Sequence, residues 1–178
     1  MAVNPVSDKI YVSNYGSNSV TVIDGATNAA STISVGIFPR PVAVNPVTNK
    51  IYVGHFIGNK VEVIDGATNS TATVGAGSDA QAVAVNPATH RIYVANSNSS
   101  SVTVIDGATN SATTVSAGTG PWAVGVNPLT NMIYVANYQS NNVTVIDGAT
   151  NSTSTVTDPS AGNPIEMCIR DSQQGLRG

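Results

Sequence analysis

Four aspartates at a fixed spacing are the first residues that could support chemistry. Each begins the sequence Asp-Gly-Ala-Thr-Asn, and they stand 41 residues apart, at Asp24, Asp65, Asp106 and Asp147. Carboxylates are favoured ligands of Ca²⁺, but the closely spaced acids of an EF-hand loop are absent. Asp-Gly is instead a tight-turn sequence, in which the carboxylate accepts a backbone N–H two residues further on. The spacing therefore predicts four structural turns, one in each repeat, and no metal site.

The two histidines are the side chains best suited to proton transfer near neutral pH. His55 lies in the segment HFIGN and His90 lies between Thr89 and Arg91. These two segments are expected at opposite ends of the molecule, so they cannot form one catalytic site. Glu62, close to Lys60, is expected to form a cross-strand pair rather than to act as a base. Nucleophile-elbow, HExxH and phosphate-loop motifs do not occur, so no catalytic residue, metal or cofactor is predicted.

The elements that must position these residues come from an internal repeat. Three landmarks recur every 41 residues through four copies without an insertion. They are Asn-Pro (Asn4, Asn45, Asn86, Asn127), Ile-Tyr-Val (from Ile10, Ile51, Ile92, Ile133) and the Asp-Gly turns described above. A spacing kept by three independent landmarks predicts four copies of one structural unit.

Each copy is predicted to contain four short strands. In the second copy these are 41–45, 50–54, 60–65 and 71–74, rich in Val, Ile, Thr and Tyr and separated by Gly, Asn, Asp and Pro. An all-β unit of about 40 residues with four antiparallel strands is typical of a β-propeller blade. Such a sheet buries both faces only by stacking on its neighbours, so the tyrosines of Ile-Tyr-Val are expected between blades. These are Tyr11, Tyr52, Tyr93 and Tyr134.

The repeat also carries a family resemblance. IYVSNYGSNSVTVIDGATN (10–28), IYVANSNSSSVTVIDGATN (92–110) and IYVANYQSNNVTVIDGATN (133–151) resemble the YVTN-family β-propeller repeat, whereas the second copy departs from it at residues 54–57. The resemblance covers about residues 2–161. It implies a propeller, commonly of seven blades, in secreted or surface-layer proteins of archaea and bacteria. It does not imply one biochemical activity.

The domain organisation expected from the repeat is four blades over 1–161, followed by a different segment over 162–178. The four blades are expected to form an open arc of a larger propeller of about seven blades, in a fragment of a longer chain; a closed four-bladed ring is the alternative. Residues 164–169 are in register with the first strand of a fifth blade, but no further repeat follows. The tail after Met167 is expected to be non-native, and Cys168, the single cysteine, is not expected to be a nucleophile.

The candidate binding residues come from the loops in which the four copies differ. Turns after the first and third strands form one end of each blade, here called the turn face, and they are nearly constant. Loops after the second and fourth strands form the other end, the loop face, and they vary, as a binding surface on a constant scaffold does. Unconstrained drift is the alternative. The large or chargeable side chains expected on the loop face are Tyr15, Phe38, Arg40, His55, Phe56, Trp122 and Tyr138, and aromatic residues and Arg are common anchors of recognition.

Composition limits the class of function. Charged residues make up 10 %, the formal net charge is −3 and the pI is near 5.0, so a nucleic-acid partner is not expected. No apolar run has the length of a membrane helix, and no signal peptide is visible. We expect a non-catalytic binding or structural module of a secreted or cell-surface protein. Its partner would be a protein or surface polymer on the loop face, and exposed blade edges allow self-association. The alternative is a fragment of a propeller enzyme, of the metal-dependent lyase or lactonase type, with a redox-associated propeller as a third class.

Overall fold

The computed structural model describes residues 1–160 and 162–165, which form sixteen strands and no helix. Blade 1 consists of β1 (Ala2–Asn4), β2 (Lys9–Asn14), β3 (Ser19–Asp24) and β4 (Ala30–Ser34). Blade 2 consists of β5 (Pro39–Asn45), β6 (Lys50–His55), β7 (Lys60–Asp65) and β8 (Thr71–Gly75). Blade 3 consists of β9 (Ala80–Asn86), β10 (Arg91–Asn96), β11 (Ser101–Asp106) and β12 (Ala112–Ser116). Blade 4 consists of β13 (Pro121–Asn127), β14 (Met132–Asn137), β15 (Asn142–Asp147) and β16 (Thr153–Val156).

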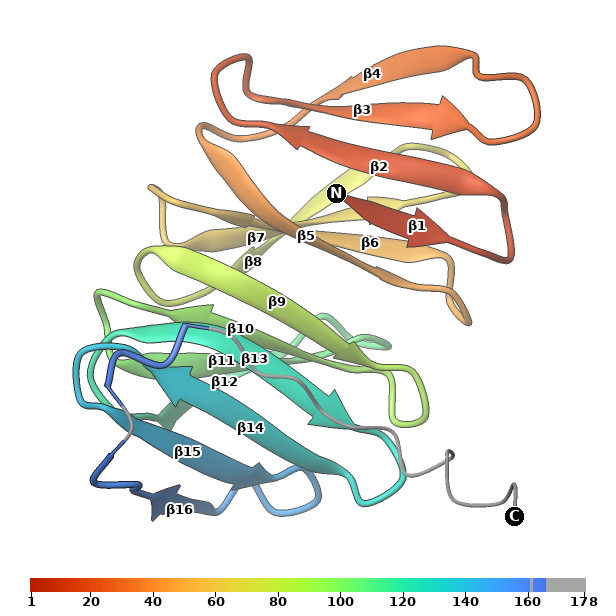
Figure 1. Cartoon of the computed structure of the whole chain (residues 1–178). Coiled ribbons are helices and arrows are strands. Elements are labelled where there is room, and N and C mark those ends of the chain that lie inside the picture. The colour runs from red at the N-terminus through yellow and green to blue at the C-terminus, as the bar shows by residue number, and fades with distance from the viewer. Residues whose placement is uncertain (161, 166–178) are drawn as a thin grey trace, which may run out of the picture.

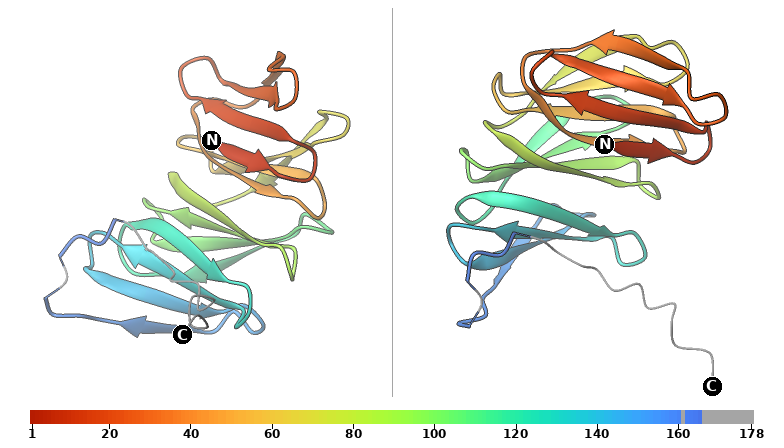
Figure 2. Two further views of the ribbon diagram at one scale, coloured as in Figure 1. Left: turned by 45° about the vertical axis from the view of Figure 1, so that its right-hand side comes forward. Right: turned by 45° about the horizontal axis from the view of Figure 1, so that its top comes forward.

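Every blade is an antiparallel sheet whose strands follow sequence order. The first strands pack against one another from blade to blade, β1 on β5, β5 on β9 and β9 on β13, so they form the inner edge of the stack. The blades fan out from this edge, and blades 1 and 4 lie at opposite ends of the fan (Figures 1 and 2). The predicted fold class is confirmed: four four-stranded β-propeller blades form an open arc, and they do not close into a four-bladed ring.

The core lies between the blades and repeats three times. Tyr52 of blade 2 is fully buried against Ile92, Val94 and Ile105 of blade 3. Tyr11 and Tyr93 occupy the same place at the other two junctions, and both are fully buried. The prediction that these tyrosines lie between blades is confirmed for all three. The fourth, Tyr134, is only half-buried, because no described blade covers its face.

A cation from each of blades 1, 2 and 3 also bonds to the next blade. Lys9 Nζ donates to the carbonyl oxygen of Gly66 at 3.1 Å, and Lys50 Nζ donates to that of Gly107 at 2.6 Å. Arg91 makes the same bond to Gly148 at 2.7 Å. The acceptor is always the glycine of an Asp-Gly turn in the following blade. Blade 4 carries Met132 at the equivalent position, where this bond cannot form.

The Asp-Gly turns are structural, as the sequence predicts. The Asp65 carboxylate accepts the backbone N–H groups of Ala67 and Thr68, both at 2.9 Å. Asp106 and Asp147 accept the N–H two residues on, whereas Asp24 accepts the N–H of Thr27. Hydrogen bonds to the charged carboxylate lower the pKa of Asp24, Asp65 and Asp106 below the usual value.

Two expectations for the end of the chain fall almost wholly outside the described residues. These are the fifth-blade strand over 164–169 and the tail after Met167, which includes Cys168. Pro164 and Ile165 are described, and neither is in a strand.

Candidate recognition surface

Six of the seven candidate residues gather on the loop face. The ring of Tyr15, from the β2–β3 loop, stacks on the ring of Phe38, from the β4–β5 loop, with centroids 4.8 Å apart and an interplanar angle of 26°. The Phe56 ring, from the β6–β7 loop, lies 6.2 Å from that of Tyr15. Trp122 and Tyr138, both from blade 4, form a second aromatic pair with centroids 5.7 Å apart. Stacked and tilted pairs at these distances are favourable aromatic geometries.

Arg40 joins the two aromatic groups. Its guanidinium carbon, Cζ, lies 5.7 Å from the ring centroid of Phe56 and also 5.7 Å from that of Trp122. Both distances fall within the range of cation–π interactions. The contacts therefore form one continuous row from blade 1 to blade 4. This set is called the aromatic–arginine row, and its members are Phe38, Tyr15, Phe56, Arg40, Trp122 and Tyr138.

β-Bulges at the inner strands direct Arg40 and Trp122 to this row. On β5 the pairing register with β6 shifts between Pro39 and Val42, and Arg40 lies in the shift. On β13 the register with β14 shifts between Pro121 and Ala123, and Trp122 lies there. A bulge re-aims a side chain that regular pleating would place elsewhere. The same shift in β9 contains Gln81, so each of these inner strands presents one residue in this way.

Phe38 is held in a conformation that is uncommon for a bulky residue. Its φ is +51°, in the left-handed region, where blades 3 and 4 have Asp79 and Gly120. Two hydrogen bonds fix its peptide groups: the Phe38 N–H donates to Asn18 Oδ1 at 3.0 Å, and the Phe56 N–H donates to the Phe38 carbonyl at 3.0 Å. A strained backbone persists only where its surroundings determine it, as they often do at ligand-binding sites.

The seventh candidate, His55, lies elsewhere than expected. Its side chain is fully buried beneath the loop face instead of projecting from it. Its Nδ1 lies 2.8 Å from the carbonyl oxygen of Ile37, and its Nε2 lies 3.4 Å from Glu62 Oε2. His55 therefore supports the loop that carries Phe38 and is not itself part of the exposed surface.

Glu62 is the centre of a buried charged network. Besides His55, Glu62 Oε2 accepts the N–H of Gly36 at 2.8 Å and lies 3.6 Å from Lys60 Nζ. The expected pair of Glu62 with Lys60 is present, but both residues lie on β7, so the pair runs along one strand; His55 on β6 is the cross-strand partner. Burial is the largest cause that lowers the His55 pKa, and nearby Lys60 acts in the same direction. The bond to Ile37 and the Glu62 charge oppose this shift.

In blades 3 and 4 the positions equivalent to His55 and Glu62 are occupied by neutral side chains. In blade 3, Asn96 Nδ2 donates to Thr103 Oγ1 at 2.9 Å, and in blade 4 Asn137 donates to Thr144 at 2.9 Å. The hydroxyl of Thr103 accepts the N–H of Gly77, as Glu62 accepts that of Gly36. Blade 2 thus replaces an Asn–Thr pair with His55 and Glu62. Sequence reasoning missed this network, although the simultaneous change of positions 55, 60 and 62 in one copy was a usable signal.

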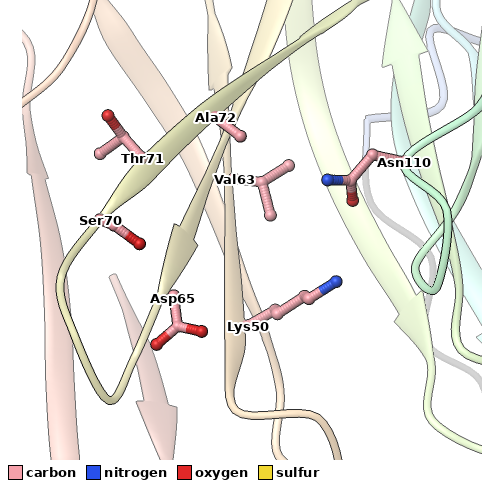
Figure 3. A pocket seen from close by; sticks show the side chains of 7 residues that line it. All are labelled: Lys50, Val63, Asp65, Ser70, Thr71, Ala72 and Asn110. Atoms are coloured by element: carbon pink, nitrogen blue, oxygen red, sulfur yellow. The ribbon is translucent and has the colours of Figure 1, made fainter.

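Shallow recesses lie between neighbouring blades. One, of about 140 Å³, is shown in Figure 3, where Asn110 of blade 3 faces Lys50 and Val63 of blade 2; its lining is Lys50, Val63, Asp65, Ser70, Thr71, Ala72 and Asn110. A counterpart of about 190 Å³ lies one blade earlier, lined by residues that include Lys9, Asp24 and Asn69. Because the recess recurs with the repeat, it follows from how blades stack rather than from a special site.

Within 1–160 and 162–165, no three His, Cys, Asp or Glu side chains come close enough together to hold a metal ion. Over the same part of the chain, no helix has the length and apolar character needed to cross a membrane.

Fold and repeat together define a β-propeller protein whose loop face carries an aromatic–arginine row. The chain belongs to the family described as "Lactonase, 7-bladed beta-propeller", whose model matches residues 60–163. No match was found among curated proteins.

Solved structures share this fold at low sequence identity. Hydrazine synthase of Kuenenia stuttgartiensis has a TM-score of 0.76 and 22 % identity, over 88 % of this chain and 48 % of that one. A chain of a nidogen–laminin complex has a TM-score of 0.70 and 12 % identity, over 88 % and 62 %. Dihydro-heme d1 dehydrogenase NirN, solved in complex with DHE, has a TM-score of 0.75 and 15 % identity, over 89 % and 36 %. The chain thus spans between about a third and two thirds of the length of these proteins.

Proposed function

We propose that this propeller chain is a non-catalytic binding module and that it recognises a partner through its loop face. The observation that carries this proposal is the aromatic–arginine row. It brings five aromatic rings and one guanidinium together from three blades, on the end of the molecule where the copies differ most. Aromatic residues and Arg contribute a large share of binding energy at protein interfaces.

The exposure of the row also supports binding. Tyr15 is 46 % exposed, and Trp122 and Tyr138 are each 37 % exposed. Large aromatic side chains that remain this accessible leave apolar area that a partner can cover, and contiguous exposed apolar patches mark interaction sites. The hydrogen bonds that fix the loop around Phe38 lower the conformational entropy lost on association, since the rings are already in place.

A secreted or surface-anchored protein of the YVTN-repeat type is the setting we propose for this module. The supporting features are the 41-residue Ile-Tyr-Val repeat and a surface whose polarity comes from Asn, Ser and Thr, with charged residues at only 10 %. Attachment of a reporter to the natural gene product and fractionation of the producing cells would test this location. Recovery of the protein only from the cytosol would contradict it.

The binding proposal is tested with two double variants that each remove two exposed side chains, one on each face. Tyr15→Ala with Trp122→Ala removes two rings from the loop face, and Val47→Ala with Leu129→Ala removes two exposed residues, 66 % and 77 % accessible, from the turn face. Labelled protein is applied to arrays of proteins and of surface polysaccharides. We expect the loop-face variant to lose its ligands and the turn-face variant to keep them. Equal binding by both variants, or no ligand for the unmodified chain, would overturn the proposal.

An enzyme of the lactonase type is the second candidate, favoured by the family match over 60–163. Its test is an assay for hydrolysis of a simple sugar δ-lactone. The reaction releases acid, and the amount of alkali needed to hold the pH constant measures its rate. Acceleration above the buffer rate that disappears on unfolding would favour the enzyme. A rate equal to that of buffer would leave the binding module as the better description of this chain.

A further inference from the structure

Arg40 is an exposed cation whose guanidinium carbon lies within cation–π distance of two aromatic rings. Phe56 and Trp122 lie at equal distances from its guanidinium. Within the described part of the chain, no carboxylate forms an ion pair with it. The guanidinium group is planar and its N–H groups point outward in that plane, where they match the two oxygens of a carboxylate. The geometry therefore leaves the recognition edge of Arg40 available.

The neighbouring acids already have partners inside the protein. Glu62 is buried and engages Gly36 and Lys60. Asp79, in the β8–β9 loop, is buried and accepts a hydrogen bond from Gln81 at 2.7 Å. Neither carboxylate forms an ion pair with Arg40, so among residues 1–160 and 162–165 its charge is left for a carboxylate of a bound molecule.

We propose that the aromatic–arginine row binds a polypeptide segment in which an Asp or Glu, held by Arg40, is flanked by apolar side chains. The inference rests on the proposed binding function and names its ligand class. Charge complementarity selects the acid, and the rings on both sides of Arg40 select apolar neighbours.

Aliphatic side chains beside the row favour a polypeptide over a sugar polymer. Ile37 precedes Phe38 and is 48 % exposed, and Ile57 follows Phe56 and is 47 % exposed. Branched aliphatic side chains offer no hydrogen bond to the many hydroxyl groups of a polysaccharide, and burying those hydroxyls unpaired is costly. The same side chains pack well on Leu, Ile or Phe of a peptide, as in the apolar centre of a protein interface.

The experiment is selection from a random heptapeptide display library on the folded chain, compared with selection on Arg40→Gln. Gln is the residue that blade 3 carries at the equivalent bulge, as Gln81, so this variant is expected to fold. Selected peptides are then titrated in solution, with fluorescence of Trp122, the single tryptophan, as the reporter. The matched peptide has its acid replaced by the amide, Glu by Gln or Asp by Asn.

We expect peptides enriched in one acid between apolar residues, and at least about a tenfold loss of affinity in Arg40→Gln or on replacing the acid by the amide. Arg40→Lys should recover only part of the affinity, since Lys cannot form the planar pair. Peptides that perturb Trp122 without an enriched acid, or that bind Arg40→Gln equally well, would overturn the inference and leave the binding function intact. If no peptide perturbs Trp122 while oligouronates do, a polysaccharide is the ligand and the inference fails. If neither does, the proposed function fails as well.

Discussion

The guanidinium of Arg40 on β5 lies 5.7 Å from the ring centre of Trp122 on β13, two blades further along the chain. The contact passes over blade 3, whose equivalent residue, Gln81, turns instead to Asp79 in its own blade. It is made at the inner strands, where the blades converge. One side-chain pair thus makes the loop face of blades 2 and 4 a continuous surface.

The inter-blade tyrosines should differ in their contribution to stability according to whether a following blade covers them. Tyr52→Ala leaves a cavity in a fully buried cluster and should lower the free energy of unfolding by about 3–5 kcal/mol. Tyr134→Ala changes a half-buried position and should cost much less. Urea unfolding followed by far-UV circular dichroism measures both. Equal losses would contradict the assignment of Tyr52 to a junction core.

The hydroxyl of Tyr52 gives a second test of the same junction. It is buried without a hydrogen-bond partner in the protein, and burial raises the Tyr52 pKa to about 12. Removing a buried polar group that has no partner is close to neutral or favourable. Tyr52→Phe should therefore keep or raise the unfolding midpoint, and a loss above about 1 kcal/mol would show that the hydroxyl is hydrogen-bonded in solution.

Stability should fall as the pH drops through the range in which His55 titrates. Burial lowers the pKa of His55 below 6.5, so the unfolded chain takes up a proton before the folded chain does. The stability that neutral His55 provides is therefore complete above pH 6.5 and is lost as the pH falls toward the folded-state pKa. Thermal melts between pH 8 and pH 5 should show this loss in the unmodified chain and not in His55→Asn.

The control for that prediction is His90→Asn. Asn occupies the equivalent position in blade 2, as Asn49, and in blade 4, as Asn131, just as Asn occupies the position of His55 in the other blades. The His90 variant retains His55 and should therefore keep the loss of stability that His55 causes between pH 8 and pH 5. If His90→Asn abolishes the loss and His55→Asn does not, the wrong histidine has been identified.

The Asp-Gly turns should make the protein sensitive to acid at lower pH. The pKa values of Asp24, Asp65 and Asp106 are lowered by hydrogen bonds to their carboxylates. Their contribution to stability is present above the usual carboxyl pKa and is lost as the pH falls through the lowered folded-state values, below about pH 4. Changing the three to Asn keeps a turn-forming acceptor and removes the titration. The melting temperature between pH 5 and pH 2 should then depend less on pH, whereas Asp8→Asn, which retains the three turn carboxylates, should keep the dependence that they cause.

The outer faces of the terminal blades should cause this chain to associate in solution. Ile10, Val12 and Ile23 of blade 1 are partly exposed, although their counterparts in blade 2 are fully buried. Light scattering after size exclusion should show a mass that rises with concentration, and Ile10→Lys should lower it. Leu129→Lys, on the turn face, is the control. A monomer at every concentration would refute the prediction.

Much of the scaffold could be predicted from the repeat. The strand predicted over 60–65 has the same bounds as β7. The strand predicted over 50–54 ends one residue before β6 does. The bounds of these two strands are determined locally, because each strand is a short run of strand-forming residues between turn residues. Residue 39 could not be placed in β5 in this way, since the bulge around Arg40 depends on pairing with β6.

The candidate surface could be predicted only in part. Loop comparison identified six residues that the fold brings together, but not their contacts, because Arg40 and Trp122 meet only when three blades have stacked. The burial of His55 was not predicted, since a polar residue in a predicted loop is expected to be exposed unless a buried hydrogen-bonding or charged partner for it is known. That partner, Glu62, takes the place of Thr103 in blade 3, and the exchange is visible only when whole copies are aligned.

The forward bonds from Lys9, Lys50 and Arg91 have a consequence for how such a protein can evolve. In blades 1, 2 and 3 the cation and the Asp-Gly turn lie in the same 41-residue unit, so a tandem duplication of one of these units would supply both the donor and the acceptor of the new inter-blade bond. Gain or loss of one of these units then requires no compensating mutation at the junctions between blades. Selection can act on the loop ends of individual copies while the shared joints stay unchanged, and blade 2, with its HFI sequence, illustrates such divergence.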